Sequence, residues 1–145
     1  MREKIKEQIL ASAFMKETMV DSCMDDIVFT ATLMIECIQN GGKILWCGNG
    51  GSAGDAQHLA TELMGGMTSH ERKPIPSIAL TTDSSFLTAW SNDTDFESVF
   101  SRQVQGIGKK GDVLVGISTS GNSENVIAAI KQAKFKGLKT VVFTG

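Results

Sequence analysis

The stretch CGNGGSAGDAQHLATE, residues 47–62, decides the fold, because it contains a strand end, a glycine-rich loop and the first turns of a helix. The apolar residues 44–47 lead into the loop and predict a buried strand. In the helix that follows, Asp55, His58 and Glu62 are three and then four residues apart, a spacing that places them on one helix face. We therefore expect two carboxylates and an imidazole on one face of this helix.

The composition is that of an ordinary globular protein. The chain has 145 residues, of which 41% are hydrophobic and 21% charged, and its net charge is −2. A chain of this length can form one hydrophobic core. No apolar run approaches the ~18 residues that a membrane span needs. The balanced charge gives no indication of electrostatic nucleic-acid binding, so neither nucleic acid nor membrane is expected as a partner.

Two features of the sequence favour the cytoplasm. Residues 2–7 are charged and are not followed by the apolar segment of a signal peptide. The three cysteines, Cys23, Cys37 and Cys47, show no metal-finger spacing and lie in or beside apolar segments. We expect them to be buried, reduced thiols.

The first 40 residues predict two helices. Residues 4–19 have apolar positions at helical intervals among charges, and a second helix is expected from about Asp21 to Gln39, ended by Asn40-Gly41-Gly42. The second helix is apolar around most of its circumference. Because a sheet covers only one side of a helix, we expect residues 1–40 to form an oligomer interface.

The remaining residues, 41–145, alternate between strand and helix patterns, which predicts a doubly wound parallel α/β sheet within a single domain, 1–145. Strands are expected at 44–47, 78–80, 113–117 and 140–143, and helices at 52–64, 96–105 and 124–136. Residues 86–90 predict a helical turn, and Ser91-Asn92-Asp93 a loop. In the last helix we expect the following residues to face inward: Val126, Ile127, Ile130 and Ala133.

The clearest ligand signal is STSGNS, residues 118–123, which we call the serine loop. It follows a predicted strand and precedes a predicted helix. Its hydroxyl groups, the free backbone N–H groups of the helix and the helix dipole favour an anion such as phosphate. The alternative is that Asn122 or Ser123 only caps the helix.

Residues 48–52, which we call the glycine loop, give a weaker signal. They lack the lysine of a nucleotide-binding P-loop. They are closer to a dinucleotide-binding fingerprint, but Gly54 stands one position late and no acidic residue follows about 20 positions on. A dinucleotide site is therefore disfavoured.

His58 and Glu62 could bind a metal ion together, or Glu62 could act as a general base. The alternative is an exposed polar helix face, because such pairs are common on helices. The predicted helix starts at the expected ligand edge of the sheet, and this position favours a functional role.

Several separated motifs, in the same order, closely resemble the phosphoheptose isomerases, which belong to the sugar isomerase (SIS) domain family. The resemblance runs from about residue 40 to residue 145. It is carried by residues 47–52 with Asp55, His58 and Glu62, by residues 79–83, by Asn92-Asp93 and by residues 111–123.

The resemblance implies an enzyme that converts sedoheptulose 7-phosphate to D-glycero-D-manno-heptose 7-phosphate through an enediol. This reaction is the first step in making heptose nucleotide precursors for lipopolysaccharide or capsule. The resemblance also implies a homotetramer with active sites at subunit contacts and one zinc ion per subunit.

The family's site residues map onto this chain by position. Glu62 would be the catalytic base, would also contact the substrate, and would bind zinc together with His58. The implied substrate-binding residues are Asn49, Gly50, Gly51, Asn92 and Asp93 for the sugar, and Ser52, Ser118, Thr119, Ser120 and Ser123 for its phosphate.

The family also has a further strand and a long C-terminal helix, whose glutamine and histidine complete the metal and acid–base set. These 145 residues do not include them. The remaining zinc ligands would then lie beyond Gly145, and we expect weak or no isomerase activity from these residues alone. Trp90 is also bulkier than expected beside Asn92-Asp93, so the motif does not specify which heptose is bound.

Two alternative functions come from other classes. One is a non-catalytic SIS-domain module of the kind that associates with the replication initiator DnaA, and the other is a sugar-phosphate sensor. The DnaA-associating relative lacks the helix carboxylate at the position of Glu62, and a sensor would keep the serine loop without needing it. The presence of Glu62 and His58 therefore favours the enzyme.

Overall fold

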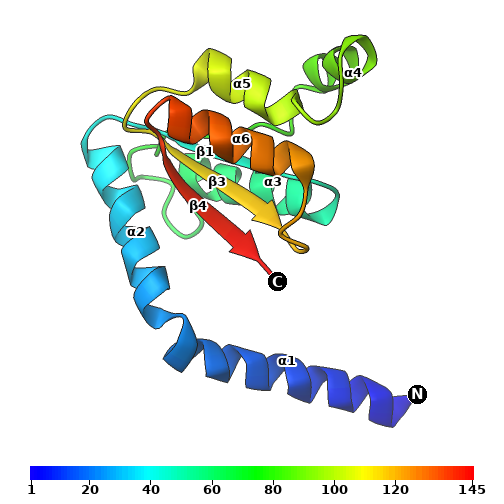
Figure 1. Cartoon of the computed structure of the whole chain (residues 1–145). Helices are drawn as coiled ribbons and strands as arrows, with labels where there is room; N and C mark the ends of the chain where they lie inside the picture. The colour runs from blue at the N-terminus through cyan, green and yellow to red at the C-terminus, as the bar shows by residue number, and fades with distance from the viewer. The chain divides into compact units, whose positions relative to one another are not determined.

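The computed structural model describes residues 1–145 (Figure 1). The chain forms two compact units, Met1–Leu33 and Met34–Gly145, and each is described by itself. None of the helices combines the length and apolarity that a membrane-spanning segment requires.

The first unit is helical, as predicted. Helix α1 spans Arg2–Ser22 and helix α2 spans Met24–Gln39, its last residues belonging to the second unit. The chain leaves α2 through Gly41, whose φ of 77° is the expected left-handed stop. No residue of α1 is buried. The large exposed apolar side chains of this unit include Ile5, Ile9, Leu10, Phe14, Met15, Met19, Val20, Ile27, Val28 and Phe29.

The second unit is built on a four-stranded parallel sheet of order β2-β1-β3-β4. The strands span Ile44–Gly48 (β1), Ser77–Ala79 (β2), Val113–Ser118 (β3) and Lys139–Thr144 (β4). The helices of this unit span Gly51–Gly65 (α3), Ser84–Asp93 (α4), Val99–Ile107 (α5) and Glu124–Phe135 (α6). This architecture confirms the predicted doubly wound α/β class.

The chain winds in opposite directions from the two central strands, β1 and β3. From β1 the chain passes through α3 to β2 on one side, whereas from β3 it passes through α6 to β4 on the other. Right-handed crossovers in opposite directions place α3 and α6 on opposite faces of the sheet, as Figure 1 shows. Every residue of β1 and β3 is buried, as expected for strands covered on both faces.

The packing between the sheet, α5 and α6 forms the main core. Its members are apolar residues from the two central strands, from α5 and α6, and from the positions just after β2 and just before β4. They are Leu45, Cys47, Leu80, Val99, Phe100, Val104, Leu114, Val126, Ala129, Ala133 and Leu138.

Two predictions near α4 and α5 were wrong. Residues 91–93 are helical rather than a loop, because Asp83 accepts a hydrogen bond from Phe86 N at 2.9 Å and starts α4, which then continues to Asp93. Helix α5 begins at Val99 rather than residue 96. There Asp95 Oδ1 accepts from Ser98 N at 2.6 Å and holds the preceding residues in a turn.

Two predictions about burial were also wrong. Ile127 is 38% exposed, because the inward face of α6 follows Asn125, Ala129 and Ala133 at intervals of four residues. Cys23 is only partly buried, since it lies between α1 and α2. Cys37 and Cys47 are buried as expected, and all three cysteines are free.

Asp112 joins the amino ends of the two central strands. Its carboxylate, only 4% exposed, accepts hydrogen bonds from Lys43 N at 3.0 Å, Lys43 Nζ at 2.6 Å and Lys109 N at 2.8 Å. Buried polar groups that lose their partners cost free energy. This carboxylate therefore ties β1 to the turn that precedes β3.

We predict that Asp112→Ala lowers the free energy of unfolding by about 2–4 kcal/mol, because three donors lose a charged acceptor. Urea denaturation followed by circular dichroism measures the change. The control is Asp21→Ala, which removes an exposed carboxylate from α1 and is expected to change the stability by less than about 0.5 kcal/mol. Equal stability of the Asp112 and Asp21 variants would contradict the prediction.

Candidate functional site

The register of the two central strands brings the glycine loop and the serine loop together. β1 pairs in parallel with β3 from Ile44↔Val113 to Gly48↔Ile117, so the two strands end at the same edge of the sheet. The loop after β2 is tied to the same edge, because Gln57 Nε2 on α3 donates to the carbonyl and the hydroxyl oxygen of Thr81, both at 3.3 Å. The three loops therefore meet beyond the carboxyl ends of the strands, which is where ligands bind in open parallel sheets.

Two glycines allow the chain to turn there. A Cβ on Gly48 would come within 2.8 Å of Ser52 O and 3.0 Å of Ile117 O, closer than real Cβ contacts. Gly50 has a φ of 55° and a ψ of −120°, and it occupies the N-cap position of α3. Glycine is the residue that adopts this conformation readily.

Beyond the end of the strand ladder, a pair of amides joins the glycine loop to the first turn of α6. Asn49 Nδ2 donates to Asn125 Oδ1 at 2.8 Å, and Asn125 Nδ2 donates to Asn49 Oδ1 at 2.8 Å. Asn125 was missed by the sequence reasoning. The available signal was its helical spacing of four residues from Ala129 and Ala133, which makes it a polar residue on a buried face.

The serine loop is held by its own hydrogen bonds. The hydroxyl oxygens of Ser118 and Ser123 lie 2.9 Å apart and share a hydrogen bond, and Gly121 N donates to Ser118 O at 3.0 Å. Gly121 has a φ of 67°. Ser118 is buried, whereas Thr119 and Ser120 are exposed at the tip of the loop.

The simple capping alternative does not describe this loop. Ser123 stands at the N-cap of α6 but makes no capping hydrogen bond, and the amide of Asn122 donates to Ser120 O at 2.9 Å instead. Helix α3 also lacks a side-chain cap, whereas α4 has one in Asp83. The N–H groups that begin α3 and α6 are therefore available to an anion at this edge of the sheet.

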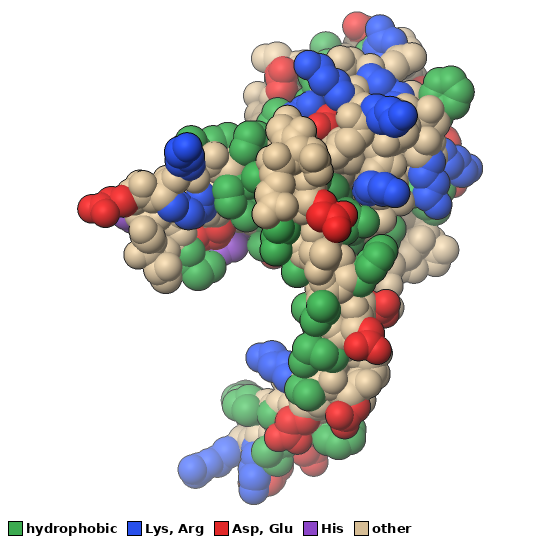
Figure 2. Space-filling model, turned by 90° about the vertical axis from the view of Figure 1, so that its left-hand side faces the viewer, with side chains coloured by type: hydrophobic (Ala, Val, Ile, Leu, Met, Phe, Trp, Pro, Cys, Tyr) green, Lys and Arg blue, Asp and Glu red, His purple; other side chains and the backbone are tan.

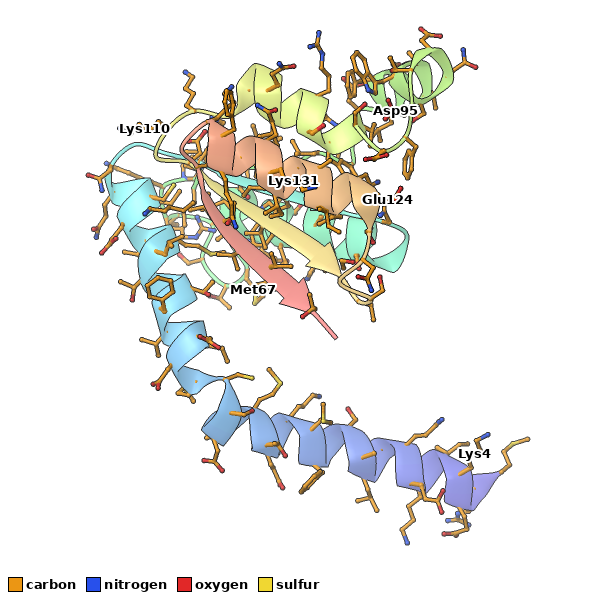
Figure 3. All side chains as sticks on the ribbon, viewed as in Figure 1. Lys4, Met67, Asp95, Lys110, Glu124 and Lys131 are labelled. Carbon is orange, nitrogen blue, oxygen red and sulfur yellow. The ribbon has the colours of Figure 1, made fainter.

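A groove beside α6 opens from the serine loop and has a volume of about 310 Å³. Figure 3 shows Glu124 at the amino end of α6 and Lys131 about two turns further along. Lys131 and Lys134 bring two positive charges to this groove. It is lined by Ser118, Gly121, Ser123, Val126, Ile127, Ile130, Lys131, Lys134 and Val142.

His58 and Glu62 share one face of α3, as predicted, with His58 Nε2 and Glu62 Oε1 3.9 Å apart. The side chain of His58 is 69% exposed and that of Glu62 is 26% exposed. Glu62 is 11 residues after the first residue of α3, about 16 Å along the helix axis. A ligand that touches both the glycine loop and Glu62 of the same chain must therefore be extended.

The chemistry of this pair suits zinc, which accepts imidazole nitrogen and carboxylate oxygen. A catalytic zinc site usually has three protein ligands. The structure contains no group of three or more histidine, cysteine, aspartate or glutamate side chains placed to hold a metal ion. The residues fit two positions of such a site and leave at least one ligand to come from elsewhere.

Asn92 and Asp93 lie apart from the other predicted site residues. Both are exposed at the end of α4, where Asn92 Nδ2 donates to Asp93 Oδ1 at 2.8 Å, and no hydrogen bond joins them to the glycine loop or the serine loop. Helix α4 is held to its neighbours by Trp90. Its Nε1 donates to Ser98 Oγ at 2.8 Å, and the Arg102 guanidinium lies 4.9 Å from its ring centre.

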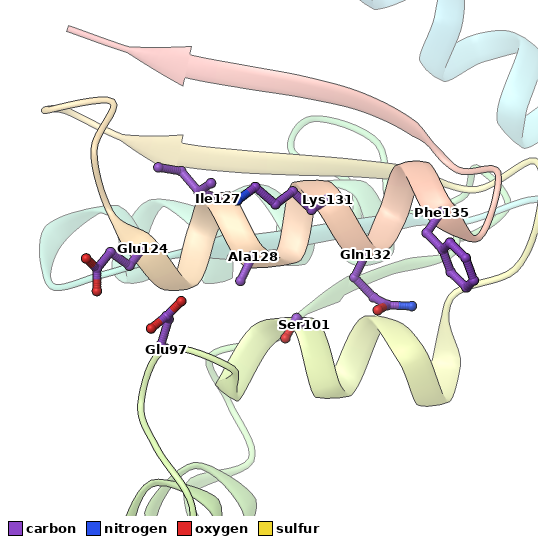
Figure 4. A pocket seen from close by; sticks show the side chains of 8 residues that line it. All are labelled: Glu97, Ser101, Glu124, Ile127, Ala128, Lys131, Gln132 and Phe135. Atoms are coloured by element: carbon purple, nitrogen blue, oxygen red, sulfur yellow. The ribbon is translucent and has the colours of Figure 1, made fainter.

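A second hollow lies between α5 and α6 and has a volume of about 620 Å³ (Figure 4). Figure 4 shows Glu97 and Glu124 at one end and Phe135 at the other. None of the predicted site residues lines this hollow. We therefore place the candidate site at the loops and not here.

Cys47 directly precedes the glycine loop, but its thiol is not suited to be a nucleophile. Burial raises the pKa of the Cys47 thiol to about 12, because the charged thiolate would lose its water. The neighbouring chemistry therefore depends on hydroxyl, amide, imidazole and carboxylate groups.

Comparison with known proteins shows close relatives. Residues 10–145 match the model of the SIS domain. The chain is 50% identical to the phosphoheptose isomerase of Chlorobaculum parvum over 99% of this chain and 69% of that protein. It is 49% identical to the phosphoheptose isomerase of Aquifex aeolicus over 100% of this chain and 75% of that protein.

Solved structures agree with this similarity. The structure of a phosphoheptose isomerase from Neisseria gonorrhoeae has a TM-score of 0.92 at 46% identity, covering 99% of this chain and 74% of that one. The structure of one from Francisella tularensis has a TM-score of 0.94 at 37% identity, with the same coverage.

We predict that Cys47 resists alkylation in the folded protein. With a pKa of about 12, only about one Cys47 thiol in ten thousand is ionised at pH 8, and thiolate is the reactive form. Iodoacetamide labelling in native buffer and in urea, followed by mass spectrometry, measures the modification of Cys47. Labelling of Cys47 should require urea, and its modification in native buffer would contradict the prediction.

Proposed function

The chain belongs to the SIS domain family and, within it, to the phosphoheptose isomerases, and from this premise we propose how its residues isomerise sedoheptulose 7-phosphate. One observation carries the proposal: the serine loop leads directly into the N-terminus of α6, which has no side-chain cap. Helix α3, which begins at the same edge of the sheet, bears Glu62. One end of this arrangement suits a phosphate and the other suits proton transfer.

The phosphate is bound by the hydroxyl groups of both loops and by the N–H groups that begin α6. We assign it the residues Ser52, Ser118, Thr119, Ser120 and Ser123. The hydrogen bond between Ser118 and Ser123 orders two of these hydroxyls in advance. Because the phosphate is remote from the reacting carbons, its binding energy positions the sugar.

The sugar end contacts Asn49, Gly50 and Gly51 of the glycine loop, and Asn92 and Asp93 from α4. The amide of Asn49 is tied to another element, because it is hydrogen bonded to Asn125 of α6. Asn92 and Asp93 have no partner in either loop within one chain. We infer that their contact with the sugar is made at a subunit contact.

Glu62 acts as the base. Its carboxylate takes a proton from C1 of the ketose, and the electrons of that C–H bond form the C1–C2 double bond of an enediol as the C2 oxygen gains a proton. Return of a proton to C2, with loss of the proton from the C1 hydroxyl, gives the aldehyde. The site can place one carboxylate against both carbons because they are adjacent.

His58 and Glu62 would also hold the zinc ion that the family implies. A zinc ion supplies a Lewis acid that polarises the carbonyl oxygen of the substrate. A third ligand would have to come from elsewhere, because one chain places no further histidine, cysteine, aspartate or glutamate beside this pair.

We predict that Glu62→Gln in the whole protein lowers the turnover of sedoheptulose 7-phosphate by roughly 10²–10⁴-fold, because the amide cannot accept the proton. Binding of the sugar phosphate, measured by calorimetry, should persist. The matched control is Glu71→Gln, an exposed glutamate outside the site, which should keep full turnover.

Three other outcomes of these measurements would contradict the base assignment or favour another function. Normal turnover by the Glu62 variant would show that Glu62 is not the base. Binding of sugar phosphate without turnover by the unaltered whole protein would favour the sensor, and absence of both would favour the non-catalytic module.

We also propose that the chain is a single SIS domain that assembles as a homotetramer in the cytoplasm, through residues 1–40. Support comes from the apolar side chains that α1 and α2 leave exposed in one chain, which Figure 2 shows among the charged side chains of the N-terminal helices. The free thiols suit a reducing compartment.

We predict that the unaltered chain sediments as a tetramer and that Ile9→Glu with Phe29→Glu shifts it to smaller species. The two introduced charges would be buried at the contact, which is unfavourable. Sedimentation velocity measures the shift. Gln8→Glu, an exposed polar position beside Ile9, is the control and should leave the tetramer intact. A monomeric unaltered chain would contradict the proposal.

A further inference from the structure

Asn125 is a buried polar residue that neither caps its own helix nor belongs to the site residues named above. It is 4% exposed and stands in the first turn of α6. Buried amides need hydrogen-bond partners, and both recorded bonds of its side chain go to Asn49, which is 76 residues away in the sequence. The side chain of Asn125 therefore serves the glycine loop and not its own helix.

The pair couples the orientations of the two amides, which can turn over only together. With its nitrogen donating and its oxygen accepting, Asn49 cannot rotate by half a turn without placing nitrogen against nitrogen and oxygen against oxygen. Each amide still has one N–H and one oxygen lone pair that the pair does not use. Asn49 thus retains one donor and one acceptor for a ligand, on the edge of the amide that faces away from Asn125.

The position of the pair adds a second effect. The ladder between β1 and β3 ends at the pair Gly48↔Ile117, and Asn49 and Asn125 form the next link between the segments that follow these strands. Residue 125 also lies two positions after Ser123, which bonds to Ser118. The amide pair therefore links the glycine loop by hydrogen bonds to the start of α6, next to the end of the serine loop.

We propose that Asn125 is a positioning residue that orients the Asn49 amide toward the sugar and holds the glycine loop in register with the serine loop. The inference rests on the proposed function for the identity of the ligand, but the ordering of the loop does not depend on it. Asn125 acts through Asn49 and does not touch the substrate.

The first test needs no ligand. Asn125→Ala should increase hydrogen–deuterium exchange of the backbone amides of residues 48–52 several-fold, because the loop loses its link to α6. Asn40→Ala, which removes an asparagine amide that bonds to Glu36 O, is the matched control and should leave this exchange unchanged. Unchanged exchange in a folded Asn125 variant would overturn the proposal.

The second test is a double-mutant cycle on the dissociation constant for sedoheptulose 7-phosphate. If Asn125 acts through Asn49, then Asn49→Ala, Asn125→Ala and the double variant should each weaken binding by a similar factor, about tenfold. Independent roles would multiply to about a hundredfold in the double variant and would overturn the proposal. A purely structural role would lower the melting temperature and leave the dissociation constant of the folded protein unchanged.

Asn125→Asp keeps the inference testable if the alanine variant does not fold. The carboxylate has the same size, suits a helix N-terminus and can still accept from Asn49 Nδ2, but it cannot donate to Asn49 Oδ1. Exchange of residues 48–52 should then lie between the values of the unaltered chain and the Asn49→Ala variant, and exchange equal to that of the unaltered chain would overturn the proposal. Failure of the unaltered chain to bind sugar phosphate would disprove the proposed function instead, while the exchange measurement would still decide the role of Asn125.

Discussion

The parallel pairing of β1 with β3 is the constraint on which the rest of this structure depends. Their residues pair from Ile44↔Val113 to Gly48↔Ile117, and both strands are buried throughout. A shift of one residue in this register would turn every side chain of one strand to the opposite face. The register also decides that the glycine loop and the serine loop leave the sheet side by side, so the stability of the core and the geometry of the site have one origin.

The close approach of these elements restricts which residues can stand there. A Cβ on Gly48 would meet Ser52 and Ile117, and one on Gly116 would come within 2.7 Å of Val126 Cγ1 of α6. Because glycine has no side chain, α3 and α6 can lie this close to the sheet. Neither helix has a side-chain cap, so the N–H groups of their first turns are free. The result is a positive, donor-rich edge that suits a phosphate, with the imidazole and carboxylate of α3 at some distance along the helix.

Most of the fold could be predicted because apolar periodicity reflects burial directly. The runs at 44–47 and 113–117 predicted the central strands, and the patterns on either side of residues 118–123 predicted a loop there between a strand and a helix. The helical state of Asn92 and Asp93 was missed because it depends on the cap by Asp83. The exposure of Ile127 was missed because both faces of α6 contain apolar residues, and only the packing against the sheet decides which face is covered.

The sequence by itself determined the elements, their order along the chain and the residue types available for chemistry, because these depend on local patterns of polarity, glycine and hydroxyl groups. Only the tertiary structure decided which of those residues meet. Asn49 and Asn125 are 76 residues apart, and no local pattern relates them. Their contact exists because the β1–β3 register brings two loops to one edge, where a buried amide must find a partner. The helix bearing Glu62 begins at this same edge, while Glu62 itself lies about three turns further along the helix.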